Sequence, residues 1–272
     1  MFMKTNSLSL FADLLLPSIK NTYDAIRRLP QLPGAYFHPW RRESVRRLAA
    51  LKDAYRGQRA FILGNGPSLR HTDLHRLHNE FTFGLNRIYL LFPELGFSTS
   101  FLVSVNDLVI EQCAHEIAAL SIPKFISWRA HRHFRHLPMS ERPIFLYTTY
   151  TGPRFARDAR GRLWEGATVT NVALQLAFHM GFQQVILVGV DHNFVSKGAA
   201  NQTVVSDGDD PNHFSPHYFG KGFRWQLPDL ETSEIGYRLA RQAYEAAGRQ
   251  VLDATIGGKL TIFPKVDYDS LF

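Results

Sequence analysis

From Arg59 onward, short apolar runs alternate with stretches of helical periodicity, and this alternation constrains the fold more than any other feature. Runs of this kind, apolar on both faces, are typical of strands buried within a sheet. Strands that alternate with helices predict an α/β fold in which a mostly parallel sheet carries helices on both faces. The expected strands are Ala60–Leu63, Phe81–Leu85, Phe101–Val105, Lys124–Ile126, Ile144–Tyr147, Val185–Val190 and Gln250–Leu252, and the clearest helices are Thr170–Met180 and Ser233–Ala247.

The first of these strands ends abruptly in a glycine turn, Gly64-Asn65-Gly66, and Pro67 then suits the first turn of a helix. The two glycines can adopt positive φ and let a ligand approach the backbone. The backbone N–H groups of Asn65, Gly66 and Ser68 would then face an anion such as a phosphate. The turn is neither a dinucleotide fingerprint, since Leu69 holds the third glycine position, nor a P-loop. A plain strand-to-helix turn is the alternative.

Small polar side chains follow several of the expected strands. Asn65 follows the first strand, Asn86 the second, Asn106 and Asp107 the third, and Asp191 with His192 and Asn193 a later one. Ligands of open α/β sheets bind at the carboxyl ends of the strands, and asparagine offers both donors and an acceptor. We therefore predict a shared nucleotide site. Asp191 would hold a ribose hydroxyl, cap the next segment or bind a metal, and Thr168 or Thr170 would cap the following helix.

The segment Asp207–Gly220, rich in proline, glycine and polar residues, is expected to form a loop or an ordered lid. His217, followed by Tyr218, is the candidate general base, because histidine titrates near neutral pH. His213 lies four residues earlier, but Pro216 between them makes a helical pair of metal ligands unfavourable, and we predict no metal site.

The segment before Arg59 differs in character from the rest of the chain. We divide the chain into a basic helical extension, residues 1–56, and a catalytic domain, residues 57–272. Residues 1–20 are apolar but interrupted by Asp13 and Pro17, so we expect a helix packed on the domain or, alternatively, an anchor at the inner membrane surface. Residues 29–40 resemble a linker, whereas Glu43–Tyr55 has helical spacing.

The net charge of +7 includes arginines at 27, 28, 41, 42, 46 and 47, and it favours anionic partners. No nucleic-acid-binding module is recognisable, so we expect no nucleic-acid partner. The one cysteine, Cys113, permits no intrachain disulfide, which suits a cytoplasmic protein.

Together these motifs resemble the bacterial family-42 sialyltransferases. The glycine turn Gly64–Leu69, Asn86, Asn106, the block Asn171–Asp191 and the sequence His217-Tyr218-Phe219-Gly220 carry the resemblance. It implies a Rossmann-like, metal-independent, inverting glycosyltransferase that takes a CMP-linked acidic sugar. His217 would be the base, and the asparagines would hold the donor. Asn193 occupies the position of a family tyrosine that assists the leaving phosphate, and Tyr218 would assist as well. The acceptor would be a surface glycan or a lipid-linked sugar, and no cofactor is implied.

A second resemblance, carried by GVDHNF and GGKLTIFPKVDY, is to a broader bacterial family grouped with archaeal 6-hydroxymethylpterin diphosphokinases. It implies a rival activity, pyrophosphoryl transfer from ATP, with Mg²⁺ held by Asp191, Asp207 and Asp209. A non-catalytic protein that binds a nucleotide or a glycan is the third alternative. Neither resemblance settles the oligomeric state.

Overall fold

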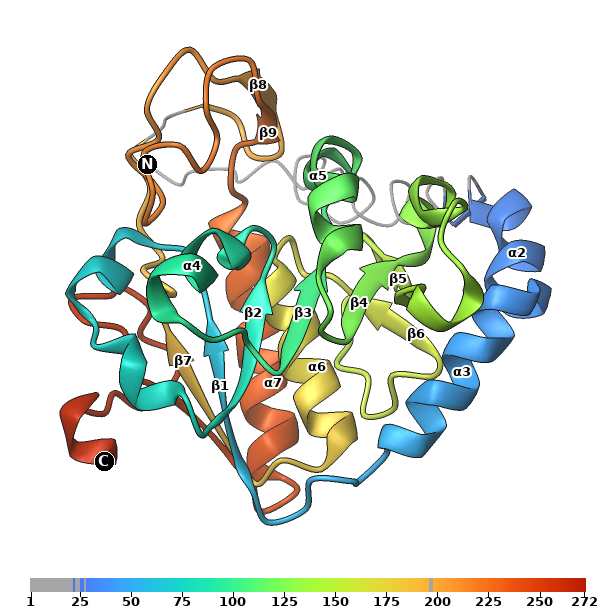
Figure 1. Ribbon diagram of the computed structural model, residues 1–272. Helices are drawn as coiled ribbons and strands as arrows, with labels where there is room; N and C mark the ends of the chain where they lie inside the picture. The colour runs from blue at the N-terminus through green and yellow to red at the C-terminus, as the bar shows by residue number, and fades with distance from the viewer. Residues whose placement is uncertain (1–21, 23–24, 27, 196–197) are drawn as a thin grey trace, which may run out of the picture.

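The computed structural model describes residue 22, residues 25–26, residues 28–195 and residues 198–272. Within this part of the chain, eight strands form one sheet in which every neighbouring pair is parallel. The predicted α/β fold is therefore confirmed (Figure 1). The helix or anchor expected at residues 1–20 lies outside the described residues. No described helix has the length and apolarity needed to span a bilayer.

The strands closely follow the apolar runs. In spatial order they are β10 (Gln250–Asp253), β7 (Gln184–Val188), β1 (Arg59–Leu63), β2 (Phe81–Leu85), β3 (Phe101–Ser104), β4 (Lys124–Ser127), β5 (Ile144–Thr149) and β6 (Arg162–Trp164). A separate antiparallel hairpin joins β8 (Thr203–Val205) to β9 (Arg224–Gln226). The helices are α2 (Leu32–Phe37), α3 (Pro39–Leu51), α4 (Phe92–Leu95), α5 (Asp107–Ala119), α6 (Val169–Met180) and α7 (Leu230–Glu245).

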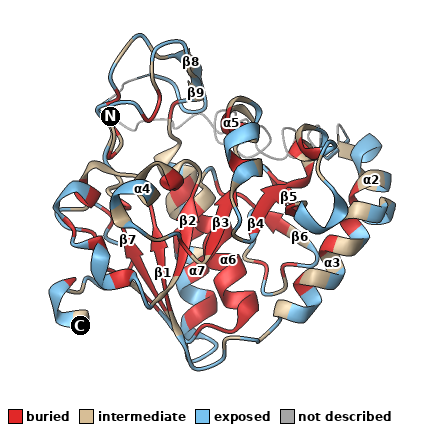
Figure 2. Cartoon of the chain, viewed as in Figure 1, coloured by how far each residue is buried: buried red, intermediate tan, exposed pale blue. Residues whose placement is uncertain are grey.

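Two apolar layers cover the two faces of the sheet. One layer contains the apolar residues of α6 together with Tyr237 and Tyr244 of α7 and Leu48 of α3. The other contains the inner face of α5, including Ile110 and Ile117, with several short 3₁₀ segments. Figure 2 shows that the strands of the sheet are buried along most of their length, whereas the helices other than α6 keep an exposed outer face. Burial on both faces explains why the strands have continuous rather than alternating apolar patterns.

The order of the strands creates one topological switch point. From β1 the chain moves outward through β2 to β6, then returns to the other side of β1 to form β7 and β10. The connections after β1 and β7 consequently leave the sheet in opposite directions, which opens a crevice at the carboxyl ends of these two strands. The β8–β9 hairpin lies above this edge of the sheet (Figure 1).

Two local predictions were wrong. Residues 29–40 are not a linker, because the 3₁₀ turn Leu29–Gln31, α2 and the start of α3 follow one another there, with Ala35 buried. The helix expected at Pro67 is only a 3₁₀ helix, Pro67–His71. Arg41, one of the arginines expected to favour anionic partners, is buried and donates from Nη2 to the Arg160 carbonyl.

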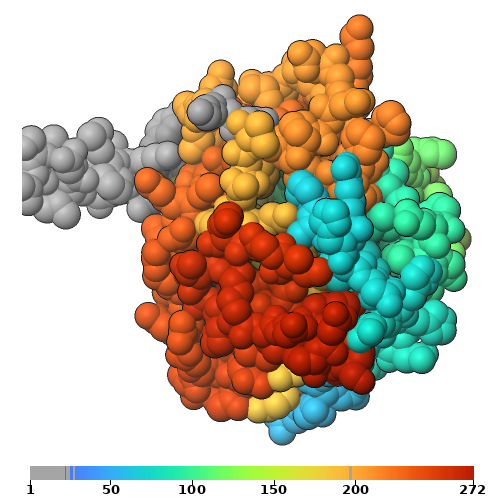
Figure 3. All heavy atoms as spheres, turned by 90° about the vertical axis from the view of Figure 1, so that its left-hand side faces the viewer, coloured from blue at the N-terminus to red at the C-terminus, as the bar shows by residue number. Residues whose placement is uncertain are grey.

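The C-terminal residues close one side of the molecule. In Figure 3 they form a continuous surface that lies against the segment after β1. The Tyr268 hydroxyl donates to the Asp73 carbonyl at 2.9 Å, and the Arg76 guanidinium lies over the Phe272 ring. This segment therefore supports the next 3₁₀ helix, Leu74–Leu77, whose N-cap is Asp73.

Acid should destabilise the fold through His179, which is buried in α6 and bonded through Nε2 to the Leu48 carbonyl. Burial lowers the pKa of His179 below its usual 6.5. The unfolded chain therefore binds this proton first as the pH falls, so stability is complete above about pH 6.5 and declines below it, by at most about 1.4 kcal/mol per pH unit. Urea unfolding at about pH 7.5 and 5.5 should show a smaller pH difference for His179→Gln than for the wild type. An equal difference would contradict this role.

Candidate active-site cleft

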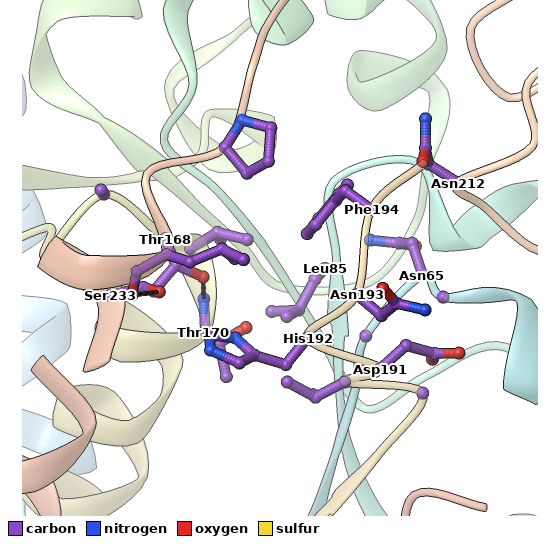
Figure 4. Close-up of a pocket in the computed structure, with 18 of the residues that line it drawn as sticks. Asn65, Leu85, Thr168, Thr170, Asp191, His192, Asn193, Phe194, Asn212 and Ser233 are labelled. Atoms are coloured by element: carbon purple, nitrogen blue, oxygen red, sulfur yellow. Dashed lines mark hydrogen bonds between the residues drawn. The ribbon is translucent and has the colours of Figure 1, made fainter. Parts of the chain in front are cut away.

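A cleft lies at the carboxyl ends of β1, β7, β2 and β3, where the topology predicts a ligand site. It consists of two adjoining cavities of about 150 and 200 Å³, which we call the β1 half and the β3 half. The two halves share Ala167, Thr168, Val169, Phe194, His213 and Pro228. Figure 4 shows the β1 half, with Asn65, Phe194 and Asn212 on one side and Thr168, Thr170 and Ser233 on the other.

The glycine turn borders the cleft, but its glycines serve a different purpose from the one expected. Neither Gly64 nor Gly66 has positive φ. A Cβ on Gly64 would lie 2.2 Å from the Gly189 carbonyl oxygen, and one on Gly66 would lie 1.8 Å from Asp191 Oδ2. Glycine is thus required here because the ends of β1 and β7 approach each other closely.

The turn also leaves fewer free N–H groups than expected. The Gly66 N–H donates to the Gly189 carbonyl at 2.9 Å, and the Ser68 N–H donates to Asp191 Oδ1 at 3.1 Å. The Ser68 hydroxyl donates to the other Asp191 oxygen at 2.6 Å. Ser68 does not line the cleft, and Asp191, which does, accepts both bonds from Ser68 through its carboxylate, which points away from Thr168 and Ser233 in Figure 4. Of the three predicted N–H donors, only that of Asn65 remains available.

The three asparagines at successive strand ends all line the cleft. Asn65 lies in the β1 half, and Asn86 and Asn106 lie in the β3 half. The Oδ1 atoms of Asn86 and Asn106 are occupied, by the Ser104 hydroxyl and by two N–H groups at the start of α5. The Oδ1 atom of Asn65 is buried and has no hydrogen-bond partner among the described residues. Buried polar atoms normally have a hydrogen-bond partner, and a ligand in the cleft would supply the missing donor.

The N-terminus of α6 forms the opposite wall. Thr168 is the N-cap, and its hydroxyl accepts the Thr170 N–H at 3.2 Å. Both threonines line the β1 half, as does Asn193. A helix N-terminus attracts negative charge, so this wall suits a phosphate or carboxylate. The Gly181 stop predicted for this helix is confirmed by its left-handed C-cap.

Backbone strain is concentrated around the cleft. Five described residues other than glycine have positive φ, and four of them, Asn86, Ala167, His192 and Asn201, line one or both halves. Such conformations cost of order 1 kcal/mol or more each and persist where the surrounding structure imposes them, commonly at functional sites.

The structure brings a different histidine into the cleft from the one predicted. His213 lines both halves, and its Nδ1 lies 2.7 Å from Oδ2 of the buried Asp210. Its ring stacks on Tyr218, with centroids 4.0 Å apart. Asp210 also accepts the Asn212 N–H, which fixes its carboxylate. A carboxylate that accepts the Nδ1 proton leaves the Nε2 lone pair free to accept a proton.

His217 and Tyr218 do not line the cleft. The loop is held on the glycine turn by Phe214, whose N–H donates to the Asn65 carbonyl and whose carbonyl accepts from Arg70 Nε. A tight turn follows, in which the Tyr218 N–H donates to the Ser215 carbonyl, and this turn leaves His217 exposed. Tyr218 is completely buried beneath His213, and burial raises the pKa of its hydroxyl.

One predicted residue, Asp107, belongs to a network behind the β3 half. Its Oδ2 accepts from Arg129 Nε at 2.9 Å, and Arg129 Nη2 donates to the Tyr150 hydroxyl and, at 2.7 Å, to Glu165. Burial lowers the pKa of Arg129, but the charges of Glu165 and Asp107 outweigh this effect and raise it. Glu165 and Tyr150 line the β3 half, whereas Asp107 does not. No sequence motif pointed to Glu165.

The carboxylates expected to hold Mg²⁺ do not converge. Asp191 lines the cleft, but Asp207 and Asp209 line neither half. Across residues 28–195 and 198–272, no three histidine, cysteine or acidic side chains are grouped so that they could hold a metal ion.

The comparisons with known proteins agree with the second resemblance, to the family grouped with 6-hydroxymethylpterin diphosphokinases. The MptE-like family, described as 6-hydroxymethylpterin diphosphokinase MptE-like, matches residues 41–197, which is more than half of the chain. The chain belongs to the MptE-like family. The matched region of this family member runs from α3 to just past β7, and it therefore includes the glycine turn, the three asparagines and Asp191 but not His213.

No curated protein matches the chain. Among solved structures, it is similar to the MAf glycosyltransferase from Magnetospirillum magneticum AMB-1, with 17% identity and a TM-score of 0.46. The match covers 89% of this chain but only 40% of that one, so the chain spans less than half the length of the MAf protein. The resemblance to family-42 sialyltransferases stays a prediction.

Proposed function

We propose that the chain is a glycosyltransferase that moves a sugar from a nucleotide donor to an acceptor hydroxyl. The single observation that carries the proposal is the pair formed by His213 and Asp210, joined at 2.7 Å beside a cleft at the topological switch point. A histidine oriented by a buried carboxylate is suited to remove a proton from a hydroxyl group. A nucleotide site in an open α/β sheet lies at this same position.

The reaction would proceed by a single displacement. His213 Nε2 takes the proton of the acceptor hydroxyl while that oxygen attacks the anomeric carbon of the sugar. The bond from this carbon to the phosphate oxygen breaks, and the nucleotide leaves with the electron pair. The N-terminus of α6 and the Asn65 N–H lie around the β1 half, where they would stabilise the phosphate charge. Attack opposite the leaving group inverts the anomeric centre.

For the donor, we propose a CMP-linked acidic sugar, as the motifs suggest. Support comes from the convergence of the motif residues Gly64, Asn65, Asn86 and Asn106 on one cleft. The hydroxyl groups of Thr168 and Thr170, at the positive end of α6, suit a sugar carboxylate. The acceptor would enter from the β3 half, which Asn86, Asn106, Tyr150 and Glu165 line.

Pyrophosphoryl transfer from ATP is the second candidate, because the family description names a diphosphokinase. It would need Mg²⁺, and Asp191, Asp207 and Asp209 do not come together to bind it. Calorimetry and thermal shift with CMP, CDP, UDP, GDP and ATP, each with and without Mg²⁺, separate the candidates. Binding of CMP or CDP without metal supports glycosyl transfer, whereas binding of ATP only with Mg²⁺ supports the diphosphokinase. The absence of any nucleotide binding would refute both.

Asn65→Asp should weaken binding of the nucleotide at least about tenfold, because it places a negative charge beside the proposed phosphate. Calorimetric titration with CMP measures the change. Asn79→Asp is the matched control, since Asn79 is exposed and lines neither half of the cleft. If the two variants bound CMP equally well, the glycine turn would not contact the phosphate.

A further inference from the structure

A third cavity, of about 510 Å³, lies beyond Arg129 at the carboxyl end of β4. One wall is formed by α2 with the residues on either side of it, and the other by the 3₁₀ helix Trp128–Phe134. Three histidines line the cavity: His38, His131 and His133. Arg129 also lines it and donates to Glu165 and Tyr150 of the β3 half, so this side chain links the cavity to the cleft.

Arginine and histidine side chains outnumber carboxylates in the lining of the cavity. Trp40 N–H donates to His38 Nδ1, so in the neutral ring the proton is on Nε2. His131 Nδ1 lies 2.8 Å from the Trp128 carbonyl, and its ring stacks on the Trp128 ring at 4.0 Å. Arg132 is exposed and forms no ion pair with any residue that the structure describes. The one carboxylate in the lining is that of Asp107: its Oδ2 accepts from Arg129 Nε, whereas its Oδ1 is buried without a hydrogen-bond partner among the described residues.

The surroundings of the histidines are electropositive. Burial lowers the pKa of each of the three, and nearby arginines lower it further: Arg135 and Arg142 act on His38, Arg135 and Arg132 on His131, and Arg132 on His133. Other groups raise the pKa: the Trp128 carbonyl raises that of His131, and Glu111 and Asp107 raise that of His133. An anion in the cavity would raise the pKa of these histidines, since negative charge favours the protonated ring.

We propose that this cavity binds an oxyanion carried by the acceptor, a phosphate, sulfate or carboxylate group, through Arg132, His38 and His133. The identification of the ligand as an acceptor rests on the proposed glycosyl transfer. The binding of an oxyanion does not rest on that proposal. An acceptor anchored here would extend past Tyr150 into the β3 half, toward His213. Both a soluble acidic glycan and a lipid headgroup can carry such an oxyanion. The lipid source is included because α2, which lines the cavity, also exposes Tyr36 and Phe37.

The first arm of the test is calorimetric titration of the full chain with glucose 6-sulfate, whose charge does not change near neutral pH, and with glucose. We expect glucose 6-sulfate to bind and glucose not to bind, with affinity rising as the pH falls from about 8 to about 6, because the histidines take up protons. Arg132→Glu should weaken binding at least about tenfold. Arg157→Glu makes the same charge change at an exposed site outside all three cavities, and it should have little effect.

The second arm identifies the source of the oxyanion. Sedimentation with phosphatidylglycerol vesicles but not phosphatidylcholine vesicles, reduced by Arg132→Glu, would assign a lipid headgroup. Binding of glucose 6-sulfate without vesicle binding would assign a soluble glycan.

Three results would overturn the proposal. They are a failure of both glucose 6-sulfate and phosphatidylglycerol vesicles to bind, an equal loss of glucose 6-sulfate affinity in Arg132→Glu and Arg157→Glu, and displacement of glucose 6-sulfate by CMP. If no nucleotide bound but the sulfate did, the oxyanion site would stand and the proposed glycosyl transfer would fall.

Discussion

His213→Ala should lower turnover by about 10²–10⁴-fold, the usual contribution of a general base, while nucleotide affinity changes little. The side chain lies between the two halves of the cleft and is oriented by Asp210 at 2.7 Å. Removing the ring takes away the proton acceptor but leaves the asparagines and the N-terminus of α6 in place. Transfer rates under saturating donor and a calorimetric titration with CMP measure the two effects separately.

Two further variants test the assignment. His217→Ala should retain wild-type turnover, because His217 is exposed and lines neither half of the cleft. Asp210→Asn should lower turnover, because an amide that donates its own hydrogen bond would favour the wrong tautomer of His213. If His217→Ala were inactive and His213→Ala active, the loop would be oriented differently and the sequence-based choice of His217 would be right.

Gly64→Ala should destabilise the fold by about 3 kcal/mol or more, the upper end of the usual cost of overpacking. The added Cβ would lie 2.2 Å from the oxygen and 2.7 Å from the carbon of the Gly189 carbonyl. Both are backbone atoms at the end of β7, and the Gly64 N–H also donates to Val188 there, so neither strand can move aside freely. The variant should lose nucleotide binding as well, because the turn forms one edge of the cleft.

Urea unfolding measures this cost, and Gly208→Ala provides the control. A Cβ on Gly208 would meet no atom within 4 Å, and its φ is not positive. That variant should therefore have nearly wild-type stability. Equal stability of the two variants would show that β1 and β7 do not approach as closely as described.

Much of the fold could be predicted because burial leaves a clear trace in the sequence. A strand such as β1, covered on both faces, must be apolar throughout, and the Thr168 cap and Gly181 stop mark the ends of α6. The short strands β6, β8 and β9 gave no such signal, and β8 and β9 are largely exposed. Residues 29–40 were misjudged because prolines that usually interrupt helices here occupy first-turn positions.

The site was predictable only in part. The asparagines at the strand ends were found because their position follows from the topology of a parallel sheet. The choice between His213 and His217 depends on tertiary contacts, namely the anchoring of Phe214 on the Asn65 carbonyl and the burial of Tyr218. The spacing of Asp210 and His213, three residues apart, was the one available signal for this pair.

Phosphorus NMR of the reaction mixture tests the central proposal most directly. The full chain is incubated without metal with a panel of CMP-linked acidic sugars and a panel of glycan acceptors, and in parallel with ATP, Mg²⁺ and 6-hydroxymethylpterin. Glycosyl transfer predicts that the sugar-linked phosphodiester signal is replaced by that of free CMP, in the wild type but not in His213→Ala. Conversion of ATP to AMP with a diphosphate ester on the pterin, while every sugar nucleotide stays intact, would contradict it.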